Sequence, residues 1–186
     1  NETERTQEIL ELLRAGKNVL VVSDAGMPTI SDPGFRLARD AMAENLSVNV
    51  IPGPSAPVMA LALSGLATDR FTFEGFAPRA LGARQALYES LRFEERTMVF
   101  FEAPHRITES LEDALAVFGA DRSAAICREM TKTYEETVRG TLAELVVWSK
   151  SKEILGEITM VIAGVAVGTA EVTAEQMVAR VREFEA

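Results

Sequence analysis

The stretch Val22-Ser-Asp-Ala-Gly-Met-Pro-Thr-Ile-Ser-Asp-Pro-Gly34 decides how the first half of the chain is organised. It overlaps the end of residues 18–23, a continuous apolar segment that is typical of a strand buried on both faces. Asp32 and Pro33 are typical of a helix start, with Asp as the N-cap and Pro in the first helical position. A strand, a loop of small and polar residues and a helix in succession indicate the α/β class.

The same alternation continues on both sides of this stretch. Upstream, Ile9, Leu12 and Leu13 share one face of a helix predicted over residues 3–15, and Gly16 follows as a stop. Downstream, further strands are predicted over residues 47–51, 71–75, 97–102, 123–129, 134–139 and 158–162, and further helices over residues 56–64, 81–92, 105–118 and 141–150.

A short polar segment at residues 67–70 marks the domain boundary that we predict. We expect an N-terminal α/β domain over residues 1–68, with mostly parallel pairing, and a second α/β domain over residues 69–165, with mixed pairing. Thr141-Leu-Ala-Glu144 and Thr173-Ala-Glu-Gln176 are capping-box patterns. The second predicts an amphipathic helix within residues 166–186.

The composition excludes several classes of protein. The chain has 186 residues, a net charge of −9 and 47% hydrophobic residues, which excludes a disordered tail or a disulfide scaffold. Its single cysteine forms no internal disulfide, so a reducing cytoplasm is expected. No apolar stretch reaches the roughly 18 residues that a membrane span needs. The acidic balance argues against a broad, non-specific nucleic-acid binder but leaves room for a local basic patch.

Three loops that follow predicted strands are candidates for a ligand site. They cover residues 23–28, 52–56 and 103–106, and ligands of open α/β sheets bind beyond the carboxyl ends of the strands. Each loop alone is explained as an ordinary turn, but the three together favour a shared site. The sequence has no metal-ligand set, no Gly-x-Ser-x-Gly, no Walker lysine and no Gly-x-Gly-x-x-Gly. Covalent hydrolysis, P-loop chemistry and a Rossmann cofactor are therefore poorly supported.

A local excess of arginine suggests a contact with phosphate groups. Residues 79–92 contain three arginines and one glutamate in an otherwise acidic chain. Such a patch binds phosphates, although a solvated helix face balanced by Glu94 and Glu95 explains it about equally well. The residues that we expect to hold phosphates are Arg79, Arg84 and Arg106.

Five motifs together resemble the tetrapyrrole methylase superfamily, and within it the branch of ribosomal RNA small-subunit methyltransferases I. Besides residues 22–34, they are Ile51-Pro-Gly-Pro-Ser-Ala56, Phe73-Glu-Gly-Phe-Ala-Pro78, Phe101-Glu-Ala-Pro-His-Arg106 and Arg128-Glu-Met-Thr-Lys-Thr-Tyr-Glu-Glu136. The resemblance runs from Asn1 to about Gly164. Members of this branch begin with a strand and a Pro-Ile-Gly-Asn-type turn, which are not found here, so we expect the first domain to be incomplete at its N-terminus.

The resemblance implies two α/β domains that hold S-adenosylmethionine in the cleft between them, usually in a homodimer. It implies methyl transfer to the 2′-hydroxyl of a cytidine ribose in small-subunit (16S) ribosomal RNA, so the expected partner is that RNA or the ribosomal subunit. No metal or membrane is implied. The cofactor-binding positions carried over from the family are Asp24, Ala25, Gly26, Met27, Ser55, Ala56, Phe101 and the backbone near Cys127 and Ile158.

The group that accepts the hydroxyl proton has several candidates. A ribose hydroxyl is a poor nucleophile, so a general base accelerates its reaction. The candidates are His105, Lys132, Glu102 and Glu129, and each has a structural alternative as a helix cap, a phosphate contact or an ion-pair partner. Two other functions stay open: a non-catalytic dimerising and RNA-docking module, and a corrin- or porphyrin-type methylase. The arginines between Arg79 and Arg106 favour RNA over a tetrapyrrole.

Overall fold

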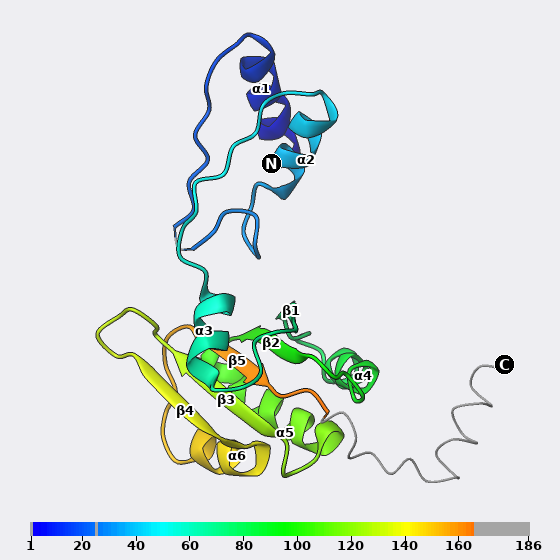
Figure 1. Cartoon of the computed structure of the whole chain (residues 1–186), viewed down its shortest axis with the longest axis vertical. Helices are drawn as coiled ribbons and strands as arrows, with labels where there is room; N and C mark the ends of the chain where they lie inside the picture. The colour runs from blue at the N-terminus through cyan, green and yellow to red at the C-terminus, as the bar shows by residue number, and fades with distance from the viewer. Residues whose placement is uncertain (1, 25, 166–186) are drawn as a thin grey trace, which may run out of the picture. The chain divides into compact units, whose positions relative to one another are not determined.

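The computed structural model describes residues 2–24 and 26–165, which belong to two compact units, 1–59 and 60–186 (Figure 1). The division falls within α3 (Ala56–Ser64), ahead of the polar segment at residues 67–70. Ala60 and Leu61, in the second half of α3, are buried in a core cluster of unit 2, which explains this position. The helix expected after Thr173 lies outside the described residues, as does Ala25.

Unit 1 contains two helices, α1 (Glu2–Arg14) and α2 (Phe35–Ala43). Leu10 of α1 and Ala41 of α2 are buried, and the Arg14 guanidinium donates to both carboxylate oxygens of Glu44 at 2.6 and 2.7 Å. The helix α1 confirms the prediction over residues 3–15. The prediction that the next helix begins at Asp32 and Pro33 is wrong, because α2 begins at Phe35. Its N-cap is Gly34, whose φ of 116° lies outside the helical range.

The strands predicted over residues 18–23 and 47–51 are not formed. Both segments lack regular secondary structure, and neither pairs with another described segment. Leu20 and Val22 are each 77% exposed, and Ile51 is 79% exposed. The prediction was wrong because a run of apolar residues specifies burial, whereas a strand also needs a neighbour to supply its ladder of hydrogen bonds.

Unit 2 is built on one five-stranded sheet with the strand order β1-β2-β5-β3-β4. The β1–β2 pair is parallel and the other three pairs are antiparallel, which confirms the predicted mixed pairing. The strands are β1 (Phe71–Phe76), β2 (Thr97–Glu102), β3 (Ser123–Arg128), β4 (Glu136–Thr141) and β5 (Ile158–Ile162).

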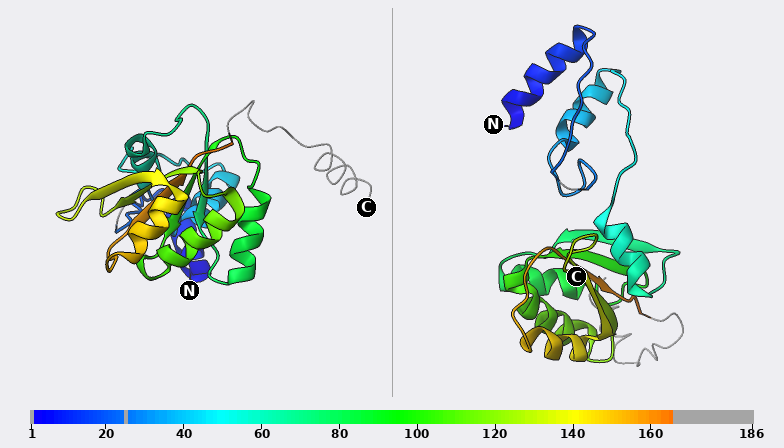
Figure 2. Two further views of the ribbon diagram at one scale, coloured as in Figure 1. Left: turned by 90° about the horizontal axis from the view of Figure 1, so that it is seen from below. Right: turned by 90° about the vertical axis from the view of Figure 1, so that its left-hand side faces the viewer.

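Helices cover both faces of this sheet (Figure 2). One face packs against α4 (Leu81–Ser90), α5 (Ile107–Phe118) and α6 (Leu142–Lys150), and α5 is preceded by the short 3₁₀ helix η1 (Pro104–Arg106). The predicted capping box at Thr141 and Glu144 is confirmed at the start of α6.

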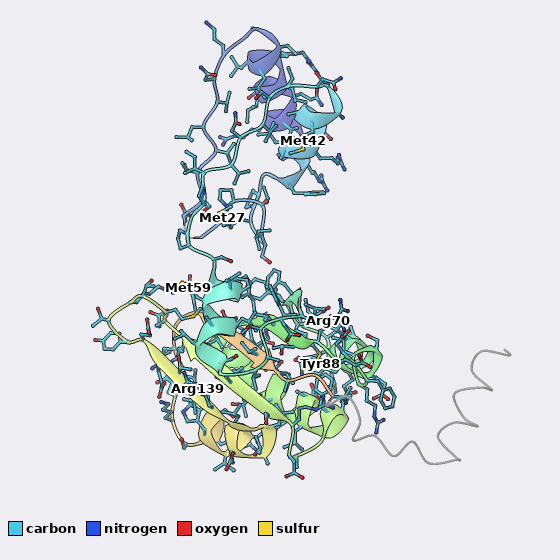
Figure 3. All side chains as sticks on the ribbon, in the orientation of Figure 1. Met27, Met42, Met59, Arg70, Tyr88 and Arg139 are labelled. Atoms are coloured by element: carbon cyan, nitrogen blue, oxygen red, sulfur yellow. The ribbon has the colours of Figure 1, made fainter. Side chains whose placement is uncertain are left out.

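The other face of the sheet carries the second half of α3. Alternate residues of β2 point to the two faces, so Phe100 packs edge-on against Tyr88 at 5.6 Å while Val99 packs with Ala60 and Leu61. Arg139 of β4 donates from Nε to the Leu63 carbonyl oxygen at 2.8 Å, which ties the end of α3 to the sheet (Figure 3).

The strands β1, β2 and β3 all end on one side of the sheet, which we call the carboxyl edge. There β1 ends at Phe76, β2 at Glu102 and β3 at Arg128, and the antiparallel strands β5 and β4 begin at Ile158 and Glu136. The loops that follow β1 and β2 therefore lie next to each other, as the parallel pairing predicts.

An ion pair before β2 predicts a loss of stability in acid. Arg96 donates to both carboxylate oxygens of Glu94 at 2.8 Å and lowers the pKa of that carboxyl to about 2. A lowered pKa stabilises the fold above the ordinary value of 4.5, and this contribution is lost as the pH falls from about 4.5 to about 2. Over this pH range Glu94→Gln should therefore lose about 1 kcal/mol less unfolding free energy than the unsubstituted chain. The value is small because the Arg96 guanidinium is half exposed. Unfolding in urea across this pH range measures it. Equal acid dependence of Glu94→Gln and the control Glu95→Gln would contradict the assignment.

Candidate functional site

Two of the three predicted ligand loops lie side by side in unit 1. A Cβ added to Gly26 would lie 3.7 Å from the carbonyl oxygen of Pro54, and one added to Gly53 would lie 3.6 Å from Sδ of Met27 (Figure 3). Gly26 has a φ of 79°, and the Ser23 hydroxyl donates to its carbonyl oxygen at 2.8 Å. Glycine is thus used where one backbone approaches the other loop and where the turn needs a positive φ.

These loops offer both a hydrogen-bond acceptor and hydrogen-bond donors. Asp24 is exposed, and its carboxylate makes no hydrogen bond or ion pair with the described residues. Ser55 and Ala56 stand at the start of α3, where the first turn of a helix has N–H groups without intrahelical partners. The carboxylate can accept a hydrogen bond from an ammonium or hydroxyl group. The start of the helix is suited to bind a carboxylate.

In unit 2, the predicted cofactor residues lie near the carboxyl edge. Phe101 and Cys127 both pair with Thr159, so the three residues form a row across the sheet. Cys127 is fully buried, its Sγ lies 3.7 Å from the Ala60 carbonyl oxygen, and burial raises the pKa of its thiol. The cysteine is therefore a packing residue. Ile158 is buried in the core on the face covered by α4, α5 and α6, so only its backbone is placed to border a ligand.

Glu102 and Arg106 form a buried ion pair at the carboxyl edge. Arg106 Nη2 lies 2.5 Å from Glu102 Oε1, which also accepts from the Ala103 N–H at 2.7 Å. Arg106 Nη1 donates to the Ala77 carbonyl oxygen at 3.4 Å, and thereby links the loops after β1 and β2. The pair supports the structural alternative for both residues. A fully buried carboxylate held by a guanidinium is poorly placed to accept a proton from RNA, and Arg106 is largely engaged within the fold.

Lys132 and Glu129 also belong to an ion-pair cluster. The Lys132 amine lies 2.9 Å from Glu129 Oε1 and 3.0 Å from Glu157 Oε2, and these hydrogen bonds raise the pKa of Lys132. Two carboxylates favour the protonated amine, so Lys132 is poorly suited to act as a base. The Glu129 carboxylate accepts from the Glu157 N–H and from Lys132, which lower its pKa.

His105 differs from the other catalytic candidates. It is exposed in η1, on the loop after β2, and its ring makes no hydrogen bond or ion pair with residues in the described part of the chain. An imidazole in such a position is accessible to a substrate. His105 therefore keeps the role of candidate base.

The two remaining arginine candidates have opposite environments. Arg84 is only 2% exposed, and its Nε and Nη2 atoms both lie 2.6 Å from Oδ2 of Asp113. The expectation that Arg84 holds RNA phosphates is therefore corrected, because its guanidinium is inside the fold. Arg79 is exposed on the loop after β1, and its side chain pairs with no carboxylate of the described residues.

The sequence reasoning missed Phe76 as a candidate site residue. The register of β1 and β2 shifts between Phe73 and Gly75, so that Phe76 pairs with Phe101. In a regular strand, residues 73 and 76 point to opposite faces, whereas this bulge puts both on the face of Phe101. A glycine inside a predicted strand, Gly75, is the signal that could have indicated the bulge.

The described ranges, 2–24 and 26–165, contain no cluster of three or more His, Cys, Asp or Glu side chains suited to a metal ion. No helix there has both the length and the apolar character to span a bilayer.

Comparisons with known proteins agree with this architecture. A family model for tetrapyrrole (corrin/porphyrin) methylases matches residues 1–146. Ribosomal RNA small subunit methyltransferase I of Mycobacterium tuberculosis is 49% identical over 183 residues, which cover 98% of this chain and 63% of that protein. The protein of the same name from Thermotoga maritima is 47% identical over 164 residues, with coverages of 88% and 73%. The chain thus spans less than two thirds of the length of the mycobacterial relative.

Solved structures show the same fold at low identity. A diphthine synthase has a TM-score of 0.64 and 18% identity, with 87% of this chain and 66% of that chain covered. Uroporphyrin-III C-methyltransferase from Thermus thermophilus, complexed with S-adenosylhomocysteine, has a TM-score of 0.57 and 16% identity, with coverages of 87% and 73%. The family model covers most of the chain and relatives of high identity agree with it, so the chain belongs to the tetrapyrrole (corrin/porphyrin) methylase family.

Proposed function

We propose that this chain is an S-adenosylmethionine-dependent methyltransferase that acts on the ribose 2′-hydroxyl of a cytidine in small-subunit (16S) ribosomal RNA. The observation that carries the proposal is the 47% identity to the Thermotoga maritima ribosomal RNA small subunit methyltransferase I, over 88% of this chain. We propose that it works in the cytoplasm as a homodimer, with the small ribosomal subunit as its partner.

The residues of both units suit S-adenosylmethionine. Its ammonium and ribose hydroxyl groups need acceptors such as the exposed carboxylate of Asp24, and its carboxylate suits the start of α3 at Ser55 and Ala56. Gly26 and Gly53 let the two loops that carry these groups approach each other closely. The ring of Phe101 supplies an apolar surface of the kind that an adenine needs.

The proposed reaction is an in-line displacement. S-adenosylmethionine supplies an activated methyl group on a sulfonium. The bond from carbon to sulfur breaks, the bond from carbon to the ribose oxygen forms, and the sulfur keeps the electron pair. His105 accepts the hydroxyl proton, while Glu102 and Arg106 hold the loops after β1 and β2 in place. Most of the remaining acceleration comes from positioning.

Replacing Asp24 tests the cofactor proposal. Asp24→Ala should weaken S-adenosylmethionine binding about 10-fold or more, because a hydrogen bond to a charged group is worth about 1.5–3 kcal/mol. Calorimetric titration of the cofactor into the chain measures this. Asp69→Ala is the matched control, since Asp69 is also exposed and makes no contact through its carboxylate with the described residues. Equal affinities of the two variants, or no binding by the unsubstituted chain, would contradict the proposal.

A further inference from the structure

Three phenylalanines form a connected aromatic surface at the carboxyl edge. The ring of Phe101 lies 5.0 Å from that of Phe73 and 5.3 Å from that of Phe76, measured between centroids. We call Phe73, Phe76 and Phe101 the aromatic step. Phe76 is its outer member and is 56% exposed. An exposed aromatic ring that packs against a second ring, which in turn packs against a third, is a rigid surface for stacking.

A backbone irregularity places Phe76 there. The bulge between Phe73 and Gly75 turns Phe76 onto the face of Phe101, and Gly75 has a φ of 70°, which favours glycine. Bulges re-aim side chains and occur often beside functional sites. If residue 76 faced only solvent, a polar side chain would serve there as well as an aromatic ring. The combination of a bulge and an exposed phenylalanine therefore points to a ligand.

The charge around the aromatic step points to a polyanion. Most cationic side chains of unit 2 are neutralised by carboxylates; these are Arg84, Arg92, Arg96, Arg106, Arg128, Lys132, Lys150 and Lys152. Among the described residues of unit 2, Arg70, Arg79, Arg122 and Arg139 form no ion pair, and of these Arg79 lies three positions after Phe76 on the loop that leaves the carboxyl edge. An unpaired guanidinium in a chain of net charge −9 is available to a phosphate.

We propose that Phe76, the outer ring of the aromatic step, is the stacking surface for a nucleobase of the RNA substrate, with Arg79 contacting a neighbouring phosphate. The inference rests on the proposed function and adds to it the surface that receives the RNA. Sequence-specific recognition of RNA uses unpaired bases stacked on aromatic rings, and phosphates are held by exposed arginines. His105 lies on the neighbouring loop, joined to the first by the hydrogen bond from Arg106 to the Ala77 carbonyl oxygen.

Binding of a short, cytidine-rich, single-stranded RNA oligonucleotide to the chain tests this inference by fluorescence anisotropy. Phe76→Leu should weaken binding about 5- to 100-fold, the range for loss of one stacked base, and Phe76→Trp should retain it. Phe93→Leu is the matched control, because Phe93 is 58% exposed in the loop before β2, and it should change affinity less than about twofold. Phe76→Leu should make no difference to the binding of an abasic version of the oligonucleotide.

Two outcomes would overturn the inference. One is RNA affinity that is equal in Phe76→Leu and Phe93→Leu, or absent from the unsubstituted chain. The other is a loss of S-adenosylmethionine affinity in Phe76→Leu without a loss of RNA affinity, which would assign the ring to the adenine of the cofactor. Failure of the proposed function gives a different result from failure of this inference. In that case the unsubstituted chain does not bind S-adenosylmethionine.

Discussion

Replacing His105 with alanine is expected to lower the rate of RNA methylation by about 100- to 10,000-fold, the range for loss of a general base. His105 is exposed and its ring has no partner among the described residues, so the fold should be unaffected. Binding of S-adenosylmethionine should also be unchanged, because the proposed cofactor contacts lie on other residues. Single-turnover methylation with labelled cofactor separates the chemical step from binding.

Chemical rescue distinguishes a base from a structural residue. Imidazole added in solution should restore part of the rate of the His105→Ala variant and should not affect the unsubstituted chain. Lys132→Met is the comparison, because the Lys132 amine is held by Glu129 and Glu157, and it should leave the chemical step unchanged. A His105→Ala rate within about tenfold of the original, or a low rate that imidazole does not raise, would argue against this role.

Replacing Arg84 with methionine should lower the free energy of unfolding of unit 2 by about 3–5 kcal/mol. The guanidinium lies 2.6 Å from the Asp113 carboxylate and also donates to the Pro78 and Arg79 carbonyl oxygens at 3.5 and 3.4 Å. Its removal leaves the largely buried carboxylate of Asp113 with the Gln85 side chain, at 3.1 Å, as its remaining donor among the described residues. Urea unfolding followed by the fluorescence of Trp148, the single tryptophan, reports on this unit.

The double variant Arg84→Met with Asp113→Leu separates the two contributions to this loss. Replacing both members of a buried pair by apolar residues removes the unpaired charge, so most of the stability should return. Arg92→Met is the control, because its pair with Glu89 is exposed on both sides and should cost less than about 1 kcal/mol. A single Arg84→Met variant as stable as Arg92→Met would show that Arg84 is not a structural residue.

Local sequence signals predicted most of unit 2. The run Thr-Met-Val-Phe-Phe-Glu at residues 97–102 has enough apolar character for a central strand, and Thr141 with Glu144 fixes the start of α6. These elements are specified by residues close to one another in the chain. The positions of β2, β5, α3 and α6 therefore agree with the predictions to within a residue.

The remaining features depend on partners that are distant in the sequence. Residues 18–23 and 47–51 have the composition of strands but lack a pairing segment among the described residues. Arg84 looked like a surface cation because Asp113, its partner, is 29 positions away. Phe76 was missed because a single bulge reverses the face on which it lies. The candidate site could be predicted at the level of its loops, whereas the role of Arg84 required its distant ion-pair partner.

The most direct test of the proposed function is methyl transfer to small ribosomal subunits that lack the modification. The chain is incubated with these subunits and with S-adenosylmethionine that carries a labelled methyl group, and the RNA is digested and mapped. The proposal predicts that the label is found on the 2′-oxygen of one cytidine of the 16S ribosomal RNA. Label on a base, label on other residues of the RNA, or no transfer to the RNA would contradict it.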